Sequence, residues 1–336
     1  MKAAIVGIAG LELTDDEIAL LRAHRPAGVI LFARNVRDPG QLVALTAHIA
    51  RALPPLAGIA IDQEGGRVAR LRPPHWLIHP PAAGLGTVYG RDRPAGLRAA
   101  WLTGALIGME AAAAGIDIVC APVLDVAVPG AGAAIGDRAY SADPDAVGEL
   151  GAAAAAGLLA AGVQPVGKHC PGHGRATVDS HEVLPHLGAI DEGDLVPFIR
   201  CAHLPWMMTA HIVYTAADPA HAATHSPAII AGTIRGRIGF EGVLVSDDLA
   251  MGALDGSPAA RALAALNAGC DLALHCSGVL AETADVLAAC PDATAATLNR
   301  MRASLFLAQR SRQRLDPTAV FAEREALLLA EREALL

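Results

Sequence analysis

Residues 162–181, GVQPVGKHCPGHGRATVDSH, join a short apolar run to a loop crowded with polar side chains. The run before Lys168 is typical of a strand that is buried on both faces. The fourteen residues from Lys168 to His181 then contain three histidines, a lysine and an aspartate. Ordering so many polar groups is costly unless something binds between them, and loops after buried strands often carry reactive groups. This stretch therefore predicts a buried strand with a site at its end.

The same unit, an apolar run followed by a polar turn and a helical pattern, recurs along the chain. Eight runs of four to seven residues fit buried strands of a parallel sheet covered by helices. They are Ala3–Ile8, Gly28–Phe32, Ala57–Ile61, Ile116–Pro122, Gln164–Lys168, Trp206–Thr209, Val243–Ser246 and Asp271–His275. Helix starts lie between them, and the stretch from Thr14 to Glu17 has the pattern of a capping box.

Eight strand–helix units in 336 residues match the size of a (β/α)8 barrel. A doubly wound α/β sheet would need a glycine fingerprint directly after an early strand, and the glycines at 130, 132 and 136 have the wrong spacing. We therefore predict an α/β fold of the (β/α)8 TIM-barrel type. No linker rich in serine, proline or glycine divides the chain. Residues 1–336 are expected to form a single catalytic domain, with C-terminal helices over about 292–336 packed on its outside.

Composition narrows the range of partners. The net charge is −8 and basic residues do not cluster, so nucleic acid is not an expected partner. No apolar stretch resembles a membrane span or a cleaved signal peptide, so we expect no membrane partner. The six cysteines lie mostly in apolar runs without metal-finger spacing, as reduced thiols do. These features predict a cytoplasmic protein, expected to be a monomer, that acts on a small-molecule substrate.

Polar side chains gather after the predicted strands, at what would be their carboxyl ends. In a barrel these ends form one rim, which is the catalytic face. Each residue alone has a structural interpretation, such as capping the next helix, but the coincidence over six strands favours a site. The residues are Arg34, Asn35, Asp62, Gln63, Glu64, Arg67, Arg70, Asp125, Arg138, Lys168, His169, Asp179, His181, His211, Asp247 and Asp248.

Three of these side chains suit covalent acid–base chemistry. Asp247 follows a buried strand, where a rigidly held carboxylate can attack an electrophilic carbon. Asp179 and His181 lie two residues apart, so they share a face in an extended loop. The aspartate can fix the tautomer of the imidazole and keep it basic enough for proton transfer near neutral pH. We predict that Asp247, His181 and Asp179 are the catalytic residues.

A second set of charged groups suits a substrate rich in hydroxyls, because buried donors and acceptors reject analogues that lack the matching group. The predicted substrate-binding residues are Asp62, Arg70, Arg138, Lys168 and His169. Together the two sets indicate a glycosidase in which an Asp–His pair replaces one of the two usual carboxylates. This scheme requires no cofactor and no metal.

Several motifs, in order and at sensible spacing, resemble the β-N-acetylhexosaminidases of glycoside hydrolase family 3. They are DQEGGRVAR at 62–70, APVLD at 121–125, KHCPGHGRATVDSH at 168–181, MTAHI at 208–212 and SDDLAM at 246–251. The chain is most similar to the short bacterial enzymes that remove N-acetylglucosamine from muropeptides during cell-wall recycling. The resemblance implies metal-free, retaining hydrolysis through a glycosyl-enzyme intermediate, with 1,6-anhydro-N-acetylmuramoyl peptides as the physiological aglycone.

Carried over motif by motif, the resemblance implies that Asp247 is the nucleophile, His181 a mobile acid/base and Asp179 its partner. The N-acetylglucosamine unit would contact Asp62, Arg70, Arg138, Lys168 and His169. This chain departs from the family at Cys170, where phenylalanine is usual. The smaller side chain is expected to loosen the packing behind Lys168 and His169, and so to change affinity more than reaction type.

Two other hypotheses about the function stay open at this point. A metal-dependent barrel hydrolase could use zinc ligands from this set, although Lys168 would place a cation beside the metal. The candidate ligands are His169, His173, Asp179, His181 and Asp247. A non-catalytic sugar-binding barrel would use the same lining, but it has no need of a nucleophile and an acid–base pair. Cys170 as a nucleophile is a minor alternative, because nothing in the sequence pairs it with a base.

Overall fold

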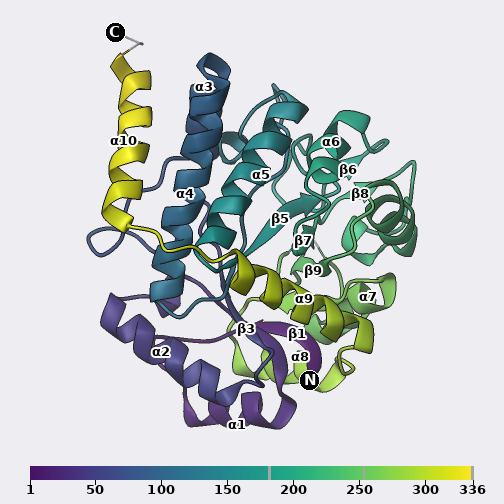
Figure 1. Ribbon diagram of the computed structural model, residues 1–336. Helices are drawn as coiled ribbons and strands as arrows, with labels where there is room; N and C mark the ends of the chain where they lie inside the picture. The colour runs from purple at the N-terminus through teal and green to yellow at the C-terminus, as the bar shows by residue number, and fades with distance from the viewer. Residues whose placement is uncertain (181–182, 253, 334–336) are drawn as a thin grey trace.

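Eight parallel strands form a closed barrel in the computed structural model, which describes residues 1–180, 183–252 and 254–333. Around the barrel the order is β1-β10-β9-β7-β5-β4-β3-β2. The barrel strands are β1 (Lys2–Gly7), β2 (Pro26–Leu31), β3 (Gly58–Ile61), β4 (Ile118–Val119), β5 (Gln164–Cys170), β7 (Trp206–Thr209), β9 (Val243–Asp248) and β10 (Leu272–His275). Each overlaps one of the eight predicted runs, and the predicted TIM-barrel fold is confirmed (Figure 1).

Helices surround the barrel and connect its strands (Figure 1). They are α1 (Asp15–His24), α2 (Pro39–Ala52), α3 (Ala82–Arg91), α4 (Arg93–Ala113), α5 (Pro144–Ala160), α6 (Glu192–Arg200), α7 (Pro258–Ala268), α8 (Leu280–Ala289), α9 (Ala295–Ser311) and α10 (Pro317–Glu333). Helix α1 begins at the predicted capping box, in which Thr14 Oγ1 accepts from the Glu17 N–H at 3.1 Å. None of the helices in the described part of the chain is long and apolar enough to cross a membrane.

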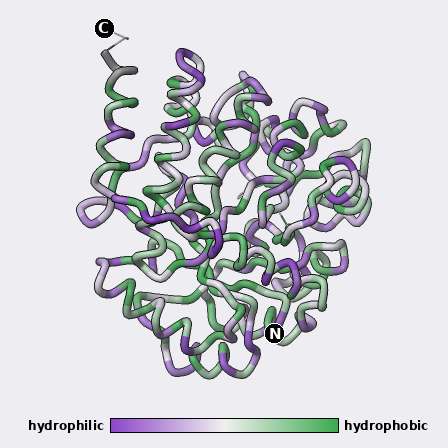
Figure 2. The backbone as a smooth tube through the Cα atoms, in the orientation of Figure 1, coloured by the Kyte–Doolittle hydropathy of each residue, from purple (hydrophilic) through white to green (hydrophobic). Residues whose placement is uncertain are grey.

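The remaining elements are short. A π-helix, η4 (Ile229–Arg237), occupies the connection between β7 and β9. Three 3-10 turns are η1 (Ala33–Asn35), η2 (Gly136–Arg138) and η3 (Ala223–His225). Strands β6 (His186–Leu187) and β8 (Val213–Tyr214) pair in parallel outside the barrel sheet. Figure 2 shows hydrophobic and hydrophilic positions alternating along the surrounding helices, as expected for helices with one face against the barrel.

The fourth strand is shorter than the sequence predicts. A strand is expected over Ile116–Pro122, but regular pairing with β5 is limited to Ile118 and Val119. Pro122 has no N–H to contribute to a ladder. Beyond it the chain still runs along β5, because Val123 bridges Lys168 and the Leu124 N–H donates to the Lys168 carbonyl at 2.6 Å. The segment after β4 is therefore held beside the residues that end β5.

Helix α9 lies across the amino-terminal end of the barrel. The Trp206 indole donates to its Ser304 hydroxyl at 2.7 Å, and that hydroxyl in turn contacts Gln164. Arg300 of the same helix pairs with Asp271, directly before β10, at 2.8 Å. Helix α10 packs instead beside α4 and α3 (Figure 1). The sequence predicts helices on the outside of the barrel, and it does not specify that α9 covers the end opposite the polar rim.

Helices α4 and α5 approach so closely that their contact requires glycine. A Cβ atom added at Gly157 would lie 2.0 Å from the Trp101 carbonyl oxygen. We expect Gly157→Ala to push the helices apart and to lower the free energy of unfolding by about 1–3 kcal/mol, as overpacking of a core does. Urea unfolding followed by circular dichroism measures this loss.

The matched control is Gly232→Ala in η4. A Cβ atom there would meet no other atom within 4 Å. Its unfolding midpoint should equal or slightly exceed that of the unchanged protein, because alanine restricts the unfolded chain more than glycine does. Equal losses in the two variants would contradict this account of the α4–α5 contact.

Candidate active site

A pocket of about 320 Å³ opens at the carboxyl ends of the barrel strands. It is lined by every predicted catalytic or substrate-binding residue that the structure describes, namely Asp62, Arg70, Arg138, Lys168, His169, Asp179 and Asp247. The predicted acid/base, His181, lies outside the described residues. Residues from four separate strand ends and loops thus meet in one cavity, as the barrel argument requires.

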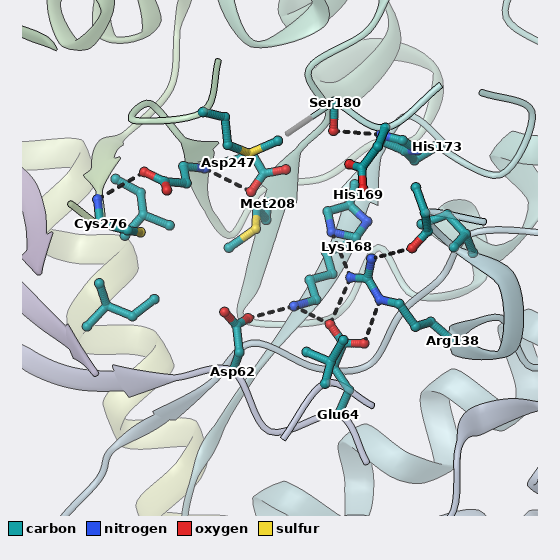
Figure 3. Close-up of a pocket in the computed structure, with 18 of the residues that line it drawn as sticks. Asp62, Glu64, Arg138, Lys168, His169, His173, Ser180, Met208, Asp247 and Cys276 are labelled. Atoms are coloured by element: carbon teal, nitrogen blue, oxygen red, sulfur yellow. Dashed lines mark hydrogen bonds and ion pairs between the residues drawn. The ribbon is translucent and has the colours of Figure 1, made fainter. Parts of the chain in front are cut away.

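One wall of the pocket is a chain of alternating charges (Figure 3). Lys168 Nζ lies between two carboxylates, 2.8 Å from Asp62 Oδ1 and 2.7 Å from Glu64 Oε1. Arg138 pairs with both oxygens of Glu64 at 2.9 Å. Arg70 Nη2 donates to the second oxygen of Asp62 at 3.2 Å. We call this sequence of contacts, Arg70–Asp62–Lys168–Glu64–Arg138, the ion-pair chain.

The ion-pair chain keeps its buried groups charged. Burial by itself would raise the pKa of Asp62 and of Glu64, but Lys168 and the neighbouring arginines hold both pKa values below their ordinary range. Burial would lower the pKa of Lys168, yet the two carboxylates raise it above its usual value. Lys168 is only 3% exposed, so its charge is tolerated because both neighbours are anions. The wall therefore presents fixed charges to a ligand at neutral pH.

The loop after β3 supplies two carboxylates to one wall because side chains alternate between the two faces of an extended segment. Side chains at 62 and 64 share a face, so the residue between them points the other way. Gln63 is fully buried and accepts from the backbone N–H groups of Arg70 and Leu71 at 2.7 and 3.0 Å. This contact folds the loop back on itself and returns Arg70 to the side of Asp62.

A second buried carboxylate, Asp125, organises the histidines. Its Oδ2 lies 2.7 Å from His169 Nδ1, and its Oδ1 accepts from the His173 N–H at 2.7 Å. A carboxylate only accepts, so His169 Nδ1 carries a proton and Nε2 faces Arg138 Nη2 at 3.4 Å. His173 Nε2 in turn lies 2.9 Å from Ser180 Oγ (Figure 3). Asp125 thereby links the end of β5 to the loop that carries Asp179 and Ser180.

Asp247 lies near the end of β9 and lines the same pocket. Its N–H contacts Thr209 Oγ1 at 3.3 Å, and its Oδ1 accepts from the Asp248 N–H at 2.8 Å. Burial alone would raise the pKa of Asp247, but His169 and His211 lower it below its ordinary value. An ionised carboxylate fixed at the barrel mouth is suited to nucleophilic attack.

The predicted catalytic and substrate-binding sets leave out Glu64, His173 and Ser180, which also line the pocket. From the sequence, His173 is expected only as a possible zinc ligand, and Glu64 only as part of the polar run after the third strand. Glu64 has a signal, since it lies two residues after Asp62 and so on the same face of an extended segment. The contact between His173 and Ser180 depends on the path of a loop, and local pattern does not encode it.

Two residues grouped with the rim serve the fold instead. Arg34 Nε donates to the Ile8 carbonyl at 2.9 Å and so ties the end of β2 to the residue after β1. His211 is fully buried, with Nε2 3.0 Å from the Asp248 carbonyl oxygen. Neither lines the pocket as the structure describes it. Strand-end position alone therefore does not separate residues of the site from residues that hold the strands.

Cys170 is fully buried, and burial raises the pKa of its thiol well above the ordinary value. A thiol in that state is not a thiolate at neutral pH, so Cys170 is unsuited to be the nucleophile. All six cysteines are free and buried. Over residues 1–180, 183–252 and 254–333, no three or more His, Cys, Asp or Glu side chains are grouped so as to hold a metal ion.

Comparison with known proteins agrees with this geometry. Residues 4–304 match the glycosyl hydrolase family 3 N-terminal domain. A β-hexosaminidase from Alkalilimnicola ehrlichii is 46% identical over 81% of this chain and 80% of its own, and one from Thiobacillus denitrificans is 42% identical over 81% and 77%. The crystal structure of NagZ from Neisseria gonorrhoeae with N-trifluoroacetyl-D-glucosamine superposes with a TM-score of 0.86 at 33% identity, covering 97% of this chain and 98% of that one. The chain therefore belongs to glycosyl hydrolase family 3 and is a glycoside hydrolase of the β-hexosaminidase type.

Proposed function

We propose that the enzyme removes terminal β-linked N-acetylglucosamine with retention of anomeric configuration, using Asp247 as nucleophile and an Asp179–His181 pair as acid and base. The observation that carries the proposal is the position of Asp247, which shares one pocket with Asp179 and the ion-pair chain. A volume of about 320 Å³ lies at the lower end of the range for small-ligand pockets. NagZ from Neisseria gonorrhoeae binds an N-acylated glucosamine, which supports the choice of sugar.

The ion-pair chain is suited to hold a sugar by its hydroxyls. Carboxylates of Asp62 and Glu64 accept from hydroxyl groups, while Lys168, Arg70 and Arg138 donate to their oxygens. Each group is already paired within the protein, so it is held in place before a ligand arrives. Preorganised charges of this kind cost little further ordering when the sugar binds.

In the first step an Asp247 oxygen attacks the anomeric carbon, and the bond from that carbon to the leaving oxygen breaks. The leaving oxygen takes a proton from the imidazolium form of His181, whose basicity Asp179 supports, and the ring becomes neutral. In the second step the neutral imidazole removes a proton from water, and the water oxygen attacks the anomeric carbon and displaces Asp247. Two inversions give net retention.

We further propose that the natural aglycone is a 1,6-anhydro-N-acetylmuramoyl peptide and that the enzyme acts in cytoplasmic peptidoglycan recycling. The likeness to NagZ over nearly the whole of both chains supports this role. The six free, buried cysteines are compatible with a reducing compartment.

The sugar specificity can be tested with a panel of p-nitrophenyl glycosides. We expect kcat/KM to be highest for the β-N-acetylglucosaminide, above the β-glucoside, the β-xyloside and the β-N-acetylgalactosaminide. Buried polar groups that match the substrate penalise analogues without the partner group. Release of p-nitrophenol reports each rate. A preference for the β-glucoside or the β-xyloside would overturn the proposed substrate class.

Asp247→Asn should remove nearly all turnover while leaving substrate binding in place, because an amide does not form the glycosyl ester. Turnover is followed by p-nitrophenol release and binding by calorimetry with N-acetylglucosamine. Asp255→Asn, an exposed aspartate in the same loop region, is the matched control and should keep full activity. Substantial turnover by Asp247→Asn would assign the nucleophile elsewhere.

His181→Ala should reduce kcat/KM by about 10²–10⁴-fold on a substrate with a sugar leaving group, the range for a general acid/base. The loss should be smaller with p-nitrophenyl as leaving group, because an activated phenolate needs little protonation. His186→Ala, an exposed histidine of the same region, is the control and should affect neither substrate. Equal losses on both leaving groups would contradict the role of His181 as the acid.

A further inference from the structure

Helix α10 carries a buried cation that is not part of the pocket. Arg324 is 1% exposed, although arginine is rarely buried to this degree without a partner. Its Nη1 lies 2.8 Å from His79 Nδ1, and its Nη2 donates to the Ile78 carbonyl at 3.4 Å. Its Nε donates to Glu325 at 3.0 Å. The residues matched by the family model end at 304, so this helix lies beyond them.

The same imidazole of His79 also forms a hydrogen bond to helix α4. Arginine only donates, so His79 Nδ1 accepts and the proton of the neutral imidazole lies on Nε2. That nitrogen is 2.8 Å from Glu110 Oε2. The other oxygen of Glu110 accepts from the Leu77 N–H at 2.8 Å. Side chains from α4 and α10 therefore both bind the segment 77–79. The hydrogen bonds from Arg324 to His79 and from His79 to Glu110 fix the orientation and the tautomer of the His79 imidazole.

The same segment supports the turn that carries the ion-pair chain. The His79 carbonyl accepts from the Gly66 N–H at 3.0 Å. The turn at Gly65 is so close to the segment that an added Cβ atom would lie 2.4 Å from the Pro80 carbonyl oxygen. Gly65 has a φ of 103°, which favours glycine in any case. Glu64 directly precedes this turn, so its position depends on where residues 78–80 lie.

Arg67 connects the turn to the segment that carries Arg138. It follows the Gly65–Gly66 turn, and its Nη2 donates to the carbonyls of Ala133 and Ala134 at 2.9 and 2.5 Å. Arg138 Nη1 donates to the same Ala134 carbonyl at 3.0 Å. The turn is thus adjacent in sequence to Glu64 and, through Arg67, shares the Ala134 carbonyl with Arg138, the partner of Glu64.

We propose that Arg324 is a positioning residue for substrate binding. It holds His79, and through the His79 carbonyl it holds the turn that places Glu64 and Arg67 in the pocket wall. Helix α10 is then part of the binding apparatus of the enzyme, although none of its described residues lines the pocket. The inference rests on the proposed function to the extent that hydrolysis is one of its readouts.

The test compares Arg324→Met and Arg324→Lys with the unchanged full-length protein on p-nitrophenyl β-N-acetylglucosaminide. We expect Arg324→Met to raise KM roughly tenfold, the equivalent of one charge-assisted hydrogen bond, with kcat changed less than about twofold. Arg324→Lys keeps a donor and should raise KM by less. Amide hydrogen exchange over residues 62–72 should quicken in the same order.

Glu323→Gln is the matched control, because it weakens the exposed pair between α10 and Arg98 without touching His79. Its KM and its exchange over 62–72 should be those of the unchanged protein. The proposal is overturned if Arg324→Met lowers only the melting temperature, or if Glu323→Gln raises KM equally. If Arg324→Met does not fold, an unchanged KM for Arg324→Lys overturns it and an intermediate rise supports it.

Hydrogen exchange separates this inference from the proposed function. Failure of the unchanged protein to hydrolyse any of the glycosides would refute the proposed function alone. Exchange over residues 62–72 would still decide whether Arg324 positions the turn, since that measurement needs no substrate. Unaltered exchange in both Arg324 variants would refute the positioning role even in an active enzyme.

Discussion

The pocket depends on the burial of one ammonium group, that of Lys168. A buried charge of this kind persists only when anions surround it, and removal of one partner of a buried pair typically costs about 3–5 kcal/mol. Asp62 and Glu64 supply those anions at 2.8 and 2.7 Å. Arg70 and Arg138 then pair with the two carboxylates, so the positions of all five charged side chains depend on one another. The five side chains that tolerate the buried cation are therefore also the ones proposed to hold a polar ligand.

The barrel makes this compensation possible because it brings distant segments to one rim. Lys168 comes from β5, its anions from the loop after β3, and Arg138 from the long segment after β4. Asp125 adds a tie between that segment and β5 through His169 and His173. Hydrogen bonds between strands set the spacing of these segments, and the charged contacts hold the loops that follow the strands. Asp247, on β9, faces a wall that is already ordered.

The sequence predicts the strands and most of the pocket because both follow local rules. Buried parallel strands are apolar runs, and the residue after such a run has to lie at the rim, which is enough to find Asp62, Lys168 and Asp247. Long-range partners are not encoded in this way. The choice of Glu64 by Arg138, over the neighbouring Asp137, depends on the path of two loops in space.

Local sequence pattern likewise does not predict the role of an element when that role depends on tertiary packing. The sequence predicts C-terminal helices packed on the outside of the barrel, but it does not indicate that α9 covers one end or that α10 places Arg324 against His79. The shortening of β4 has a local cause in Pro122, but the continued contact with β5 at Val123 does not. Polar side chains at the strand ends also divide into two roles. Arg34 and His211 hold backbone carbonyls, and only the folded structure separates them from the groups that line the pocket.

The closure of one barrel end by α9 has a consequence for how this scaffold can change. Ser304 and Arg300 hold the starts of the strands together, far from the rim where the ligand would lie. Loops at that rim can therefore be lengthened or exchanged, in evolution or by grafting, without weakening the contacts that α9 makes at the other end of the barrel. The loop between β3 and α3 is the exception. A loop grafted there has to keep its contact with the last helix, because a loop without His79 would leave Nη1 of the buried Arg324 without its acceptor.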